Sequence, residues 1–489
     1  MKNVLNWKRF LDFCLWTALS GVVIFAVSHH EPWTDEAQSW LLARDLNWIQ
    51  LVFGELRYEG HPGLWYSILW VTIHIFHLPY SALGYVGASF AILGFAVVIL
   101  LAPFPLVLRY SIVCSYFFVY QYAVIARSYV LLPLLAFGAA SLFRHRPRWT
   151  LALALVLSLL GHVSVHGAVI ALGIALAYGM WVWPRWPELE SPDRRRTAVS
   201  GSIFCAALIL LVIVLYPPQT ETVALSDAQT FTAREHLLKS VLVVFVALNR
   251  WPLLGALFFA PIALWLSYRP SGLLLSFVGA GGVALIYGFC RGTRHHEGII
   301  IIALLTAIWS VWPSEPELRN STREFLNLHK ILVWSLTILF MWQTYLASVA
   351  LRRDWYEPYT GAKDAATYLK SMQTDLANCA GYTVGLVAIQ PYFSHNIFVN
   401  LGGSEAPGFY HQSVTFENTV AGMDAFAHRS TNPPCVVMSY SVDEKIINRS
   451  VKQIEAQGYR LVHTSTGTAF FENEPGEPQL YMIFVRRPS

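Results

Sequence analysis

The sequence predicts an α-helical polytopic membrane protein with a small α/β domain at its C-terminal end. Of its 489 residues, 55% are hydrophobic and 13% are charged, the charged share being about half the usual one. The mean hydropathy is +0.46, and many runs reach the roughly 20 apolar residues that a spanning helix needs. The net charge of +4 is small, so nothing indicates a nucleic-acid partner.

The apolar segments predict 11 to 13 transmembrane helices. They lie at 10–28, 62–78, 82–102, 106–125, 128–143, 150–164, 166–183, 198–216, 251–267, 272–290, 298–313 and 329–349. A further apolar piece at 237–250 is short, so we expect it to lie in the interface or to form half of a helix bent at Pro252.

Clusters of Lys and Arg predict the orientation. Basic residues precede the first span and separate two later pairs of spans, at Lys2, Lys8, Arg9, Arg144, Arg146, Arg148, Arg194, Arg195 and Arg196. The positive-inside rule places these groups in the cytoplasm and the loop 29–61 outside. Placing Arg127 outside as well requires one segment between 62 and 125 to span only partly.

The chain changes character near residue 350. This predicts a transmembrane domain at 1–351 and a soluble α/β domain at 352–489 on the outer face. Strands are expected at 383–389, 434–440 and 480–486, and helices at 362–372 and 442–458. The soluble domain holds two of the six cysteines, Cys379 and Cys435, which an oxidising compartment would allow to pair.

The stretch "WTDEAQSW" opens the first outer loop with acids. Thr34 is placed to cap a helix whose first turn carries Asp35 and Glu36. Carboxylates there complement the helix dipole, which is a sufficient structural explanation. Because Asp35 and Glu36 are expected at the membrane surface, beside the interfacial Trp33 and Trp40, we favour a functional role for these acids.

Further polar residues lie at the ends of later spans. "YEGHPGLWY" (58–66) supplies Glu59 and His61, and "RHHEG" (294–298) supplies Arg294, His295 and His296. Arg127 lies in a strongly apolar stretch, where a charge costs about 2.5–3.5 kcal/mol on insertion scales. Snorkelling to the interface and binding of an anion explain Arg127 equally well.

Other histidines have structural explanations. His162 and His166 are four apart, but no third metal ligand is evident and Gly161 and Ser164 suggest a turn, so a structural role is favoured. No metal and no cofactor is predicted.

Carboxylates together with Arg and His at one face indicate a type of reaction. A carboxylate can take the proton of an acceptor hydroxyl, while the cations stabilise a departing phosphate. This chemistry fits displacement of a lipid-linked phosphate by a hydroxyl.

The order of these motifs resembles that of GT-C membrane glycosyltransferases, in particular protein O-mannosyltransferases and lipid A aminoarabinose transferases. The matching stretches are "WTDEAQSW" (33–40), "GHPGLWY" (60–66), "YAVIARSYVLL" (122–132) and "RHHEG" (294–298). In two places the sequence departs from the pattern: Gly63 replaces a proline, and Ile125-Ala126 stands where relatives carry an acid.

The resemblance implies an inverting transfer of a sugar from a polyprenyl-phosphate donor at the outer face of the inner (plasma) membrane. Asp35 would be the base, with Glu36 or Glu59 in support. The donor phosphate would be held by His61, Arg127, Arg294, His295 and His296, without a metal.

Two other classes remain open at this stage. A transporter or flippase of lipid-linked sugars would use the same Arg and His, but would need polar residues at mid-membrane depth and a path to both faces. A membrane acyltransferase would need a His deep in a span, and the nearest candidates, His74 and His77, lie at a segment end.

Overall fold

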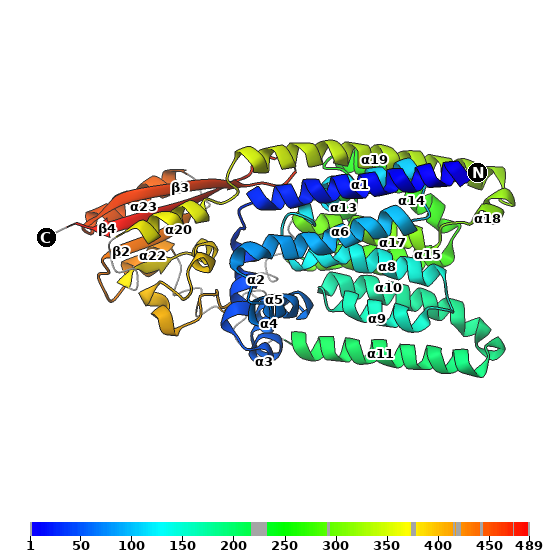
Figure 1. Ribbon diagram of the computed structural model, residues 1–489, viewed down its shortest axis with the longest axis horizontal. Coiled ribbons are helices and arrows are strands. Elements are labelled where there is room, and N and C mark those ends of the chain that lie inside the picture. The colour runs from blue at the N-terminus through cyan, green and yellow to red at the C-terminus, as the bar shows by residue number, and fades with distance from the viewer. Residues whose placement is uncertain are drawn as a thin grey trace.

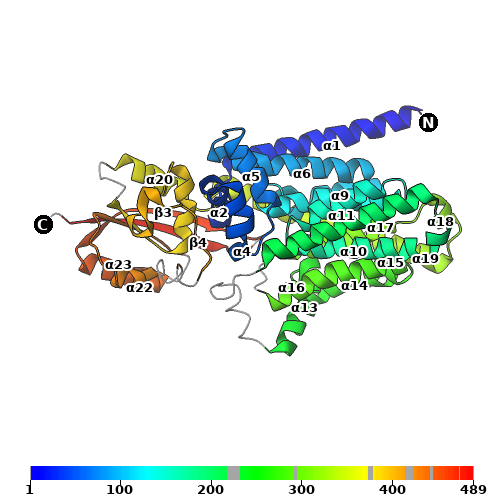
Figure 2. The same ribbon diagram turned by 90° about the horizontal axis from the view of Figure 1, so that it is seen from below.

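The protein consists of a bundle of long helices with a smaller mixed domain at one end (Figure 1). The computed structural model describes residues 2–216, 232–290, 294–372, 378–413, 416, 422–440, 444–472 and 474–487. The N-terminus lies at the far end of the bundle, and the C-terminal domain covers the other end, here called the domain end (Figures 1 and 2).

Six stretches of the described chain are long and apolar enough to cross a membrane. They include the long helices α1 (Lys2–His29), α6 (Leu83–Leu101), α10 (Val165–Val182), α11 (Ser191–Leu215) and α19 (Arg323–Tyr356). The sixth stretch joins α15 (Pro270–Ser276) to α16 (Gly282–Phe289) through a π-helical turn at Phe277–Gly281. The protein is therefore a multi-span membrane protein, as predicted.

The bent helix expected near Pro252 is present. Helix α13 (Ala233–Leu248) and helix α14 (Pro252–Ser267) meet at an angle of 84°, and Pro252 starts the second of them, where its missing N–H costs nothing. The other predicted spans correspond to shorter helices: α7 (Leu106–Val113), α8 (Leu132–Arg144), α9 (Thr150–Gly161) and α17 (Glu297–Ser310).

The segment predicted to span at 62–78 does not cross the bundle. Its helix, α5 (Leu64–His74), has 11 residues, a length of about 16 Å at 1.5 Å per residue. It lies at the domain end with the helices of the first loop, which are α2 (Thr34–Asp45), α3 (Trp48–Gln50) and α4 (Leu56–Glu59) (Figure 1). Trp70 and His74 bond the Leu46 and Ala43 carbonyls of that loop. This is the segment that had to span only partly.

The opposite end of the bundle carries the basic loops. Arg144 and Arg146 line one cavity with Arg269 and with Glu317 of helix α18 (Glu315–Arg319). The loop with Arg144 and Arg146 therefore lies beside α18, and the C-terminal domain lies at the other end of the bundle (Figure 2).

The C-terminal domain is built on a four-stranded sheet in the order β1-β2-β4-β3. The strands are β1 (Ala380–Tyr382), β2 (Cys435–Tyr440), β3 (Tyr459–Ala469) and β4 (Glu477–Arg486). β1 pairs with β2 in parallel, and the other pairs are antiparallel, with Val437 opposite Ile483 at the buried centre. The helices are α20 (Ala362–Ser371), α22 (Gly422–Ala427) and α23 (Glu444–Ala456).

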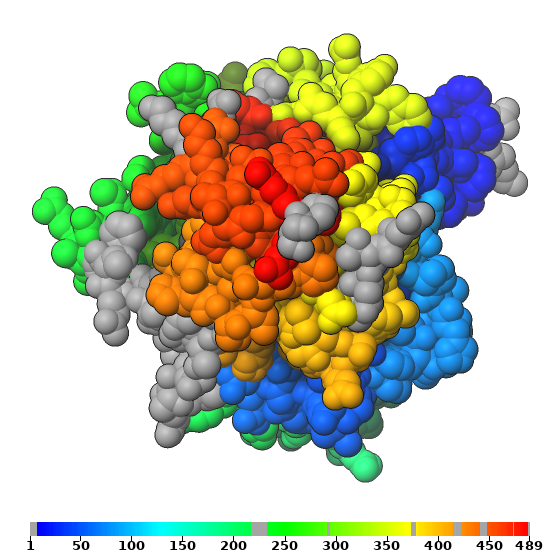
Figure 3. Space-filling model, turned by 90° about the vertical axis from the view of Figure 1, so that its left-hand side faces the viewer, coloured from blue at the N-terminus to red at the C-terminus, as the bar shows by residue number. Residues whose placement is uncertain are grey.

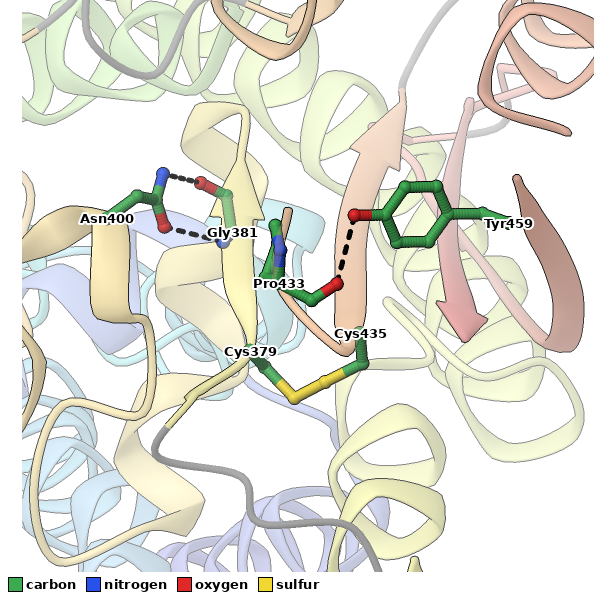
Figure 4. The surroundings of a disulfide bond; sticks show 6 residues. All are labelled: Cys379, Gly381, Asn400, Pro433, Cys435 and Tyr459. Atoms are coloured by element: carbon green, nitrogen blue, oxygen red, sulfur yellow. Dashed lines mark hydrogen bonds between the residues drawn. A yellow bond between two sulfur atoms is a disulfide. The ribbon is translucent and has the colours of Figure 1, made fainter. Parts of the chain in front are cut away.

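Two strands expected from the sequence are confirmed and one is wrong. Residues 383–389 form a 3₁₀ turn at Val384–Ala388, because Thr383 has a φ of 86° that ends the strand. Strand β3 was not expected from the sequence, because buried and exposed residues alternate irregularly along its length. The Cys379–Cys435 disulfide joins the start of β1 to the start of β2 (Figure 4).

The first loop and the C-terminal domain are locked together. Glu31 accepts hydrogen bonds from the backbone N–H groups of Gly361 (3.1 Å) and Lys363 (2.5 Å), and so caps helix α20. Seen end on, the domain covers the middle of the domain end and residues of the first loop lie below it (Figure 3). The predicted boundary at 351 falls inside α19, which continues to Tyr356.

Candidate functional site

The two acids of "WTDE" lie in the first turn of α2 and point to different surroundings. The helix starts at Thr34 with Trp33 as its N-cap, so the predicted cap is wrong by one residue. Glu36 closes the turn by accepting from the Trp33 N–H at 3.1 Å.

Glu36 is fully buried, with 0% of its surface exposed. Its Oε1 accepts from the Ala126 N–H at 2.6 Å, and its Oε2 lies 3.1 Å from His30 Nε2. Both oxygens are therefore bonded inside the protein. Glu36 therefore holds the backbone segment next to Arg127 in place, and neither of its oxygens is free to contact a substrate.

His30 bridges Glu36 to the end of the last long helix. Its Nδ1 lies 3.1 Å from the carboxylate of Asp354. Burial by itself lowers the pKa of His30, but Asp354 and Glu36 together raise it to about 10. The imidazole is therefore a buried cation held between two carboxylates.

Asp35 lies on the accessible side of the same turn. Its side chain is 39% exposed, and its Oδ2 lies 2.9 Å from Arg127 Nη1. The Arg127 guanidinium also lies over the rings of Trp33 and Tyr129, at 5.7 and 5.3 Å from their centroids. Arg127 therefore has a partner and is held in one orientation, which excludes simple snorkelling.

Arg127 leads directly to the histidines of "RHHEG". Its Nη1 donates to His295 Nε2 at 2.8 Å, and the Tyr129 hydroxyl is hydrogen-bonded to His296 Nε2 at 2.7 Å. Burial, Arg127 and the neighbouring rings hold the pKa of His295 well below its usual range, and burial and His295 do the same for His296. Both imidazoles are neutral.

His61 joins this group from the start of α5. Its Nδ1 donates to the Glu59 carbonyl at 2.7 Å, which fixes the tautomer and leaves Nε2 unprotonated. Burial and the Arg127 guanidinium lower the pKa of His61.

The Glu59 carboxyl differs from that of Asp35 in its burial and its protonation. Its Oε1 accepts from Gln38 Nε2 at 2.8 Å. Burial raises the pKa of the Glu59 carboxyl to about 8, and the Glu55 and Asp35 carboxylates add to the shift. At neutral pH this acid is therefore mostly protonated.

Arg294 is the predicted residue that the structure does not bring to the others. It forms an ion pair with Glu474 of the C-terminal domain, and Arg250 lies 3.1 Å from the other oxygen of the same carboxylate. Arg294 is half exposed. Its contact fastens the C-terminal domain to the bundle.

His166, for which the sequence favoured a structural role, lies beside the predicted site residues. Its ring stacks on that of His296 with centroids 4.9 Å apart. His162 does have a structural partner, the Ala207 carbonyl at 3.1 Å. The sequence feature that could have pointed to His166 is its position two residues after Ser164. Ser164 caps helix α10, so His166 lies in the first turn of that helix.

The C-terminal domain forms one wall beside the acids. The Gln38 amide exchanges hydrogen bonds with the backbone of Tyr410 (2.5 and 2.8 Å). Glu55 pairs with His411 at 2.5 Å, and Arg44 donates to the Phe393 carbonyl at 2.7 Å. This wall lies beside Glu59, so it is close enough to influence what approaches Asp35.

The arrangement suits the proposed transfer chemistry. One accessible carboxylate is paired with a buried cation, and neutral histidines extend from that cation. Within the part of the chain that the structure describes, no group of three or more His, Cys, Asp or Glu is arranged to hold a metal ion.

No family model matches the sequence, and no curated protein sequence matches it. Among solved structures, the chain is similar to ArnT from Cupriavidus metallidurans bound to undecaprenyl phosphate. The TM-score is 0.54 at 13% identity, over 96% of this chain and 97% of that chain. The apo state of the same ArnT gives a TM-score of 0.54 at 12% identity, over 98% of each chain. At this identity the likeness shows the fold, and it agrees with the resemblance to lipid A aminoarabinose transferases.

Proposed function

We propose that the protein is an inverting glycosyltransferase that moves a sugar from a polyprenyl-phosphate donor to an acceptor hydroxyl. The observation that carries this proposal is the Asp35–Arg127 pair, with His295 bonded to the same guanidinium. The ArnT structure of the same fold was solved with undecaprenyl phosphate bound, which is the lipid product expected from such a donor.

We assign the role of base to Asp35 rather than to Glu36 or Glu59, and the surroundings of the three acids support this choice. Glu36 has both oxygens bonded inside the protein, and Glu59 is mostly protonated at neutral pH. Asp35 alone is both exposed and adjacent to a cation. A carboxylate so placed takes the acceptor proton while the hydroxyl oxygen attacks the sugar carbon.

The donor phosphate is assigned to Arg127, His61, His295 and His296. Arg127 supplies the permanent positive charge, and His295 and His296 lie beside it. The N–H of His61 is bonded to the Glu59 carbonyl, so His61 would donate to the phosphate only after Nε2 is protonated. Arg294 would reach the phosphate only by leaving Glu474, so we assign it a secondary role. Direct attack of the acceptor oxygen on the sugar carbon, with the phosphate as the leaving group, would invert the configuration of that carbon.

The orientation proposed is the one that the basic loops favour. Arg144 and Arg146 lie at the end opposite the site, so the positive-inside rule puts the site and the C-terminal domain outside the cytoplasm. The Cys379–Cys435 disulfide agrees with an oxidising compartment.

The test uses the full chain in nanodiscs with a panel of polyprenyl-phosphate sugars and a membrane extract as acceptor. Turnover and donor binding are measured for the wild type, Asp35→Asn and the control Asp193→Asn. Asp193 is also an acid close to an arginine, Arg196 at 3.5 Å, but it lies at the start of α11, far from the site.

We expect Asp35→Asn to lose turnover by about 10²–10⁴-fold, the range for a general base, while donor binding persists and Asp193→Asn behaves as the wild type. The anomeric configuration of the product, read by NMR, tests inversion. Donor binding without turnover in the wild type would instead support a transporter or flippase of lipid-linked sugars.

A further inference from the structure

Helix N-termini converge on the histidine group. The 3₁₀ turn Ser128–Leu131 leads into α8, Ser164 caps α10, and the turn Arg294–His296 leads into α17. Tyr129, His166 and His296 are side chains from these starts, and their rings lie within 4.9 to 6.3 Å of one another. Helix N-termini favour anions, so three of them together favour a strongly charged anion.

His166 is the side chain at this meeting point that lacks a polar contact. It is 8% exposed, and among the described residues its ring nitrogens make no hydrogen bond. His61, His295 and His296 each have one nitrogen committed, to the Glu59 carbonyl, Arg127 and Tyr129 respectively. The His166 nitrogens are not among the fully buried polar atoms that lack a partner, so they are accessible to a ligand bound in the site.

The charge of the phosphate changes during the proposed transfer, and this inference rests on that proposed function. The donor is a phosphodiester with one negative charge. When the acceptor oxygen bonds to the sugar carbon, the bond from that carbon to the phosphate oxygen breaks. The acceptor proton goes to Asp35, and the lipid leaves as a phosphate monoester with two negative charges, its second pKa being about 6.

The site holds one permanent cation for these two charges. Arg127 is that cation in the described part of the site, and Asp35 already offsets it. The groups that face His166 are Tyr129 from the turn before α8, His295 and His296 from the turn before α17, and His61 from the first loop. None of these is charged at neutral pH, and burial and His61 lower the pKa of His166 itself to about 4, so His166 is neutral before the phosphate binds. Within the described part of the site, a proton is the remaining source of a second positive charge.

We propose that His166 takes up one proton from solvent as the phosphate becomes a dianion. His166 is the suitable carrier, because it contacts Tyr129 and His296 while Arg127 contacts Tyr129 and His295. The intervening rings separate the new charge from the existing one. The site therefore binds the monoester product more tightly than the diester donor. In the complex with the monoester, His166 carries the added proton.

The experiment is calorimetric binding to the full chain in nanodiscs at pH about 7.5, where the free monoester is mostly a dianion. The probes are a polyprenyl phosphate and its methyl diester, each measured in two buffers of different ionisation enthalpy. The difference between buffers gives the protons taken up. The variants are His166→Phe and His166→Gln, of which the second keeps a polar side chain that cannot be charged.

The matched control is His162→Phe, a histidine four residues earlier whose nitrogen bonds the Ala207 carbonyl of α11. We expect the wild type and this control to take up about one proton with the monoester and none with the diester. Both His166 variants should lose the uptake and bind the monoester about tenfold more weakly, as for loss of one charge-assisted hydrogen bond, with diester affinity unchanged.

Two results overturn the proposal. One is monoester binding by the wild type without proton uptake, and the other is undiminished uptake in both His166 variants. If the wild type binds neither lipid, the donor site itself is wrongly assigned and the proposed function fails with it.

Discussion

His30 and Asp354 are 324 residues apart in the chain, and their side chains meet in the protein interior at 3.1 Å. The same imidazole bonds Glu36, the neighbour of the proposed base. The last transmembrane helix is thereby connected to the first helical turn of the site through one protonated ring. The position of Asp35 depends on both ends of the chain.

Substitution of His30 should strongly destabilise the protein. His30→Asn leaves two buried carboxylates without their cation, and breaking a buried pair costs about 3–5 kcal/mol. We expect a clear drop in the thermal unfolding midpoint of the detergent-solubilised protein. The neighbouring His29, which is exposed and bonds within its own helix, provides the control His29→Asn.

The stabilisation that protonated His30 provides through Asp354 and Glu36 depends on pH. The pKa of His30 rises from 6.5 to about 10, although burial alone would lower it, because Asp354 and Glu36 favour the cation. Its stabilisation is therefore fully present below pH 6.5 and is lost as the pH rises through about 10. If the wild-type midpoint fell no more than that of His30→Asn between pH 6.5 and about 10, this assignment would be contradicted.

Glu59 should make the protein less stable as the pH rises. Burial raises the pKa of its carboxyl from 4.5 to about 8, so within that window the unfolded chain has lost a proton that the folded chain keeps. Folding stability contributed by this group therefore falls from pH 4.5 to about 8 and is constant above it. In Glu59→Gln the decline of the unfolding midpoint over this window should be smaller, and an unchanged decline would exclude Glu59 as its source.

Gly298 is required by close packing at the turn that carries the histidines. A Cβ at this position would overlap the Phe117 ring and lie 2.7 Å from the Tyr122 hydroxyl. That hydroxyl donates to the His295 carbonyl at 2.6 Å, so its displacement moves His295. Gly298→Ala should cost about 1–3 kcal/mol, as overpacking does, and lower sugar transfer.

The control for that substitution is Gly138→Ala in α8, where a Cβ would meet nothing within 4 Å. This change should leave transfer unaltered and stabilise the helix by about 1 kcal/mol. Transfer and the unfolding midpoint are measured for both variants. Equal transfer by the two would show that the turn tolerates a side chain.

Removal of the Cys379–Cys435 disulfide should destabilise the C-terminal domain. The bond closes a loop with a sequence separation of 56, which corresponds to about 4 kcal/mol in the chain-entropy account. Cys379→Ser or Cys435→Ser should lower the denaturant midpoint of the domain, measured by its protease resistance. Cys205→Ser, at an exposed free cysteine in α11, is the control and should have no effect.

The sequence predicted the bundle well because transmembrane helices follow from composition and length alone. The bend at Pro252 was also predictable, because proline cannot continue a helix. The segment 62–78 was harder, since its apolar character is that of a span. What keeps it at the domain end is a pair of side chains, Trp70 and His74, bonded to backbone carbonyls of the first loop.

The predicted site was partly recovered for a physical reason. Asp35, His61, Arg127, His295 and His296 lie together, because each starts or precedes a helix at the same end of the bundle. The different states of the acids could not be read from sequence. Burial and distant partners such as Asp354 and Gln38 decide them, and a single sequence does not show which residues meet across hundreds of positions.

The contacts of the first loop also set the order in which the protein becomes competent. His30, Glu31 and Gln38 leave the ribosome early, but their partners Asp354, Gly361 and Tyr410 follow 324, 330 and 372 residues later. A nascent or truncated chain can insert its helices into the membrane without those partners. It has no finished site until the C-terminal domain has been translated and docked, so under the proposed function incomplete chains would not transfer sugar.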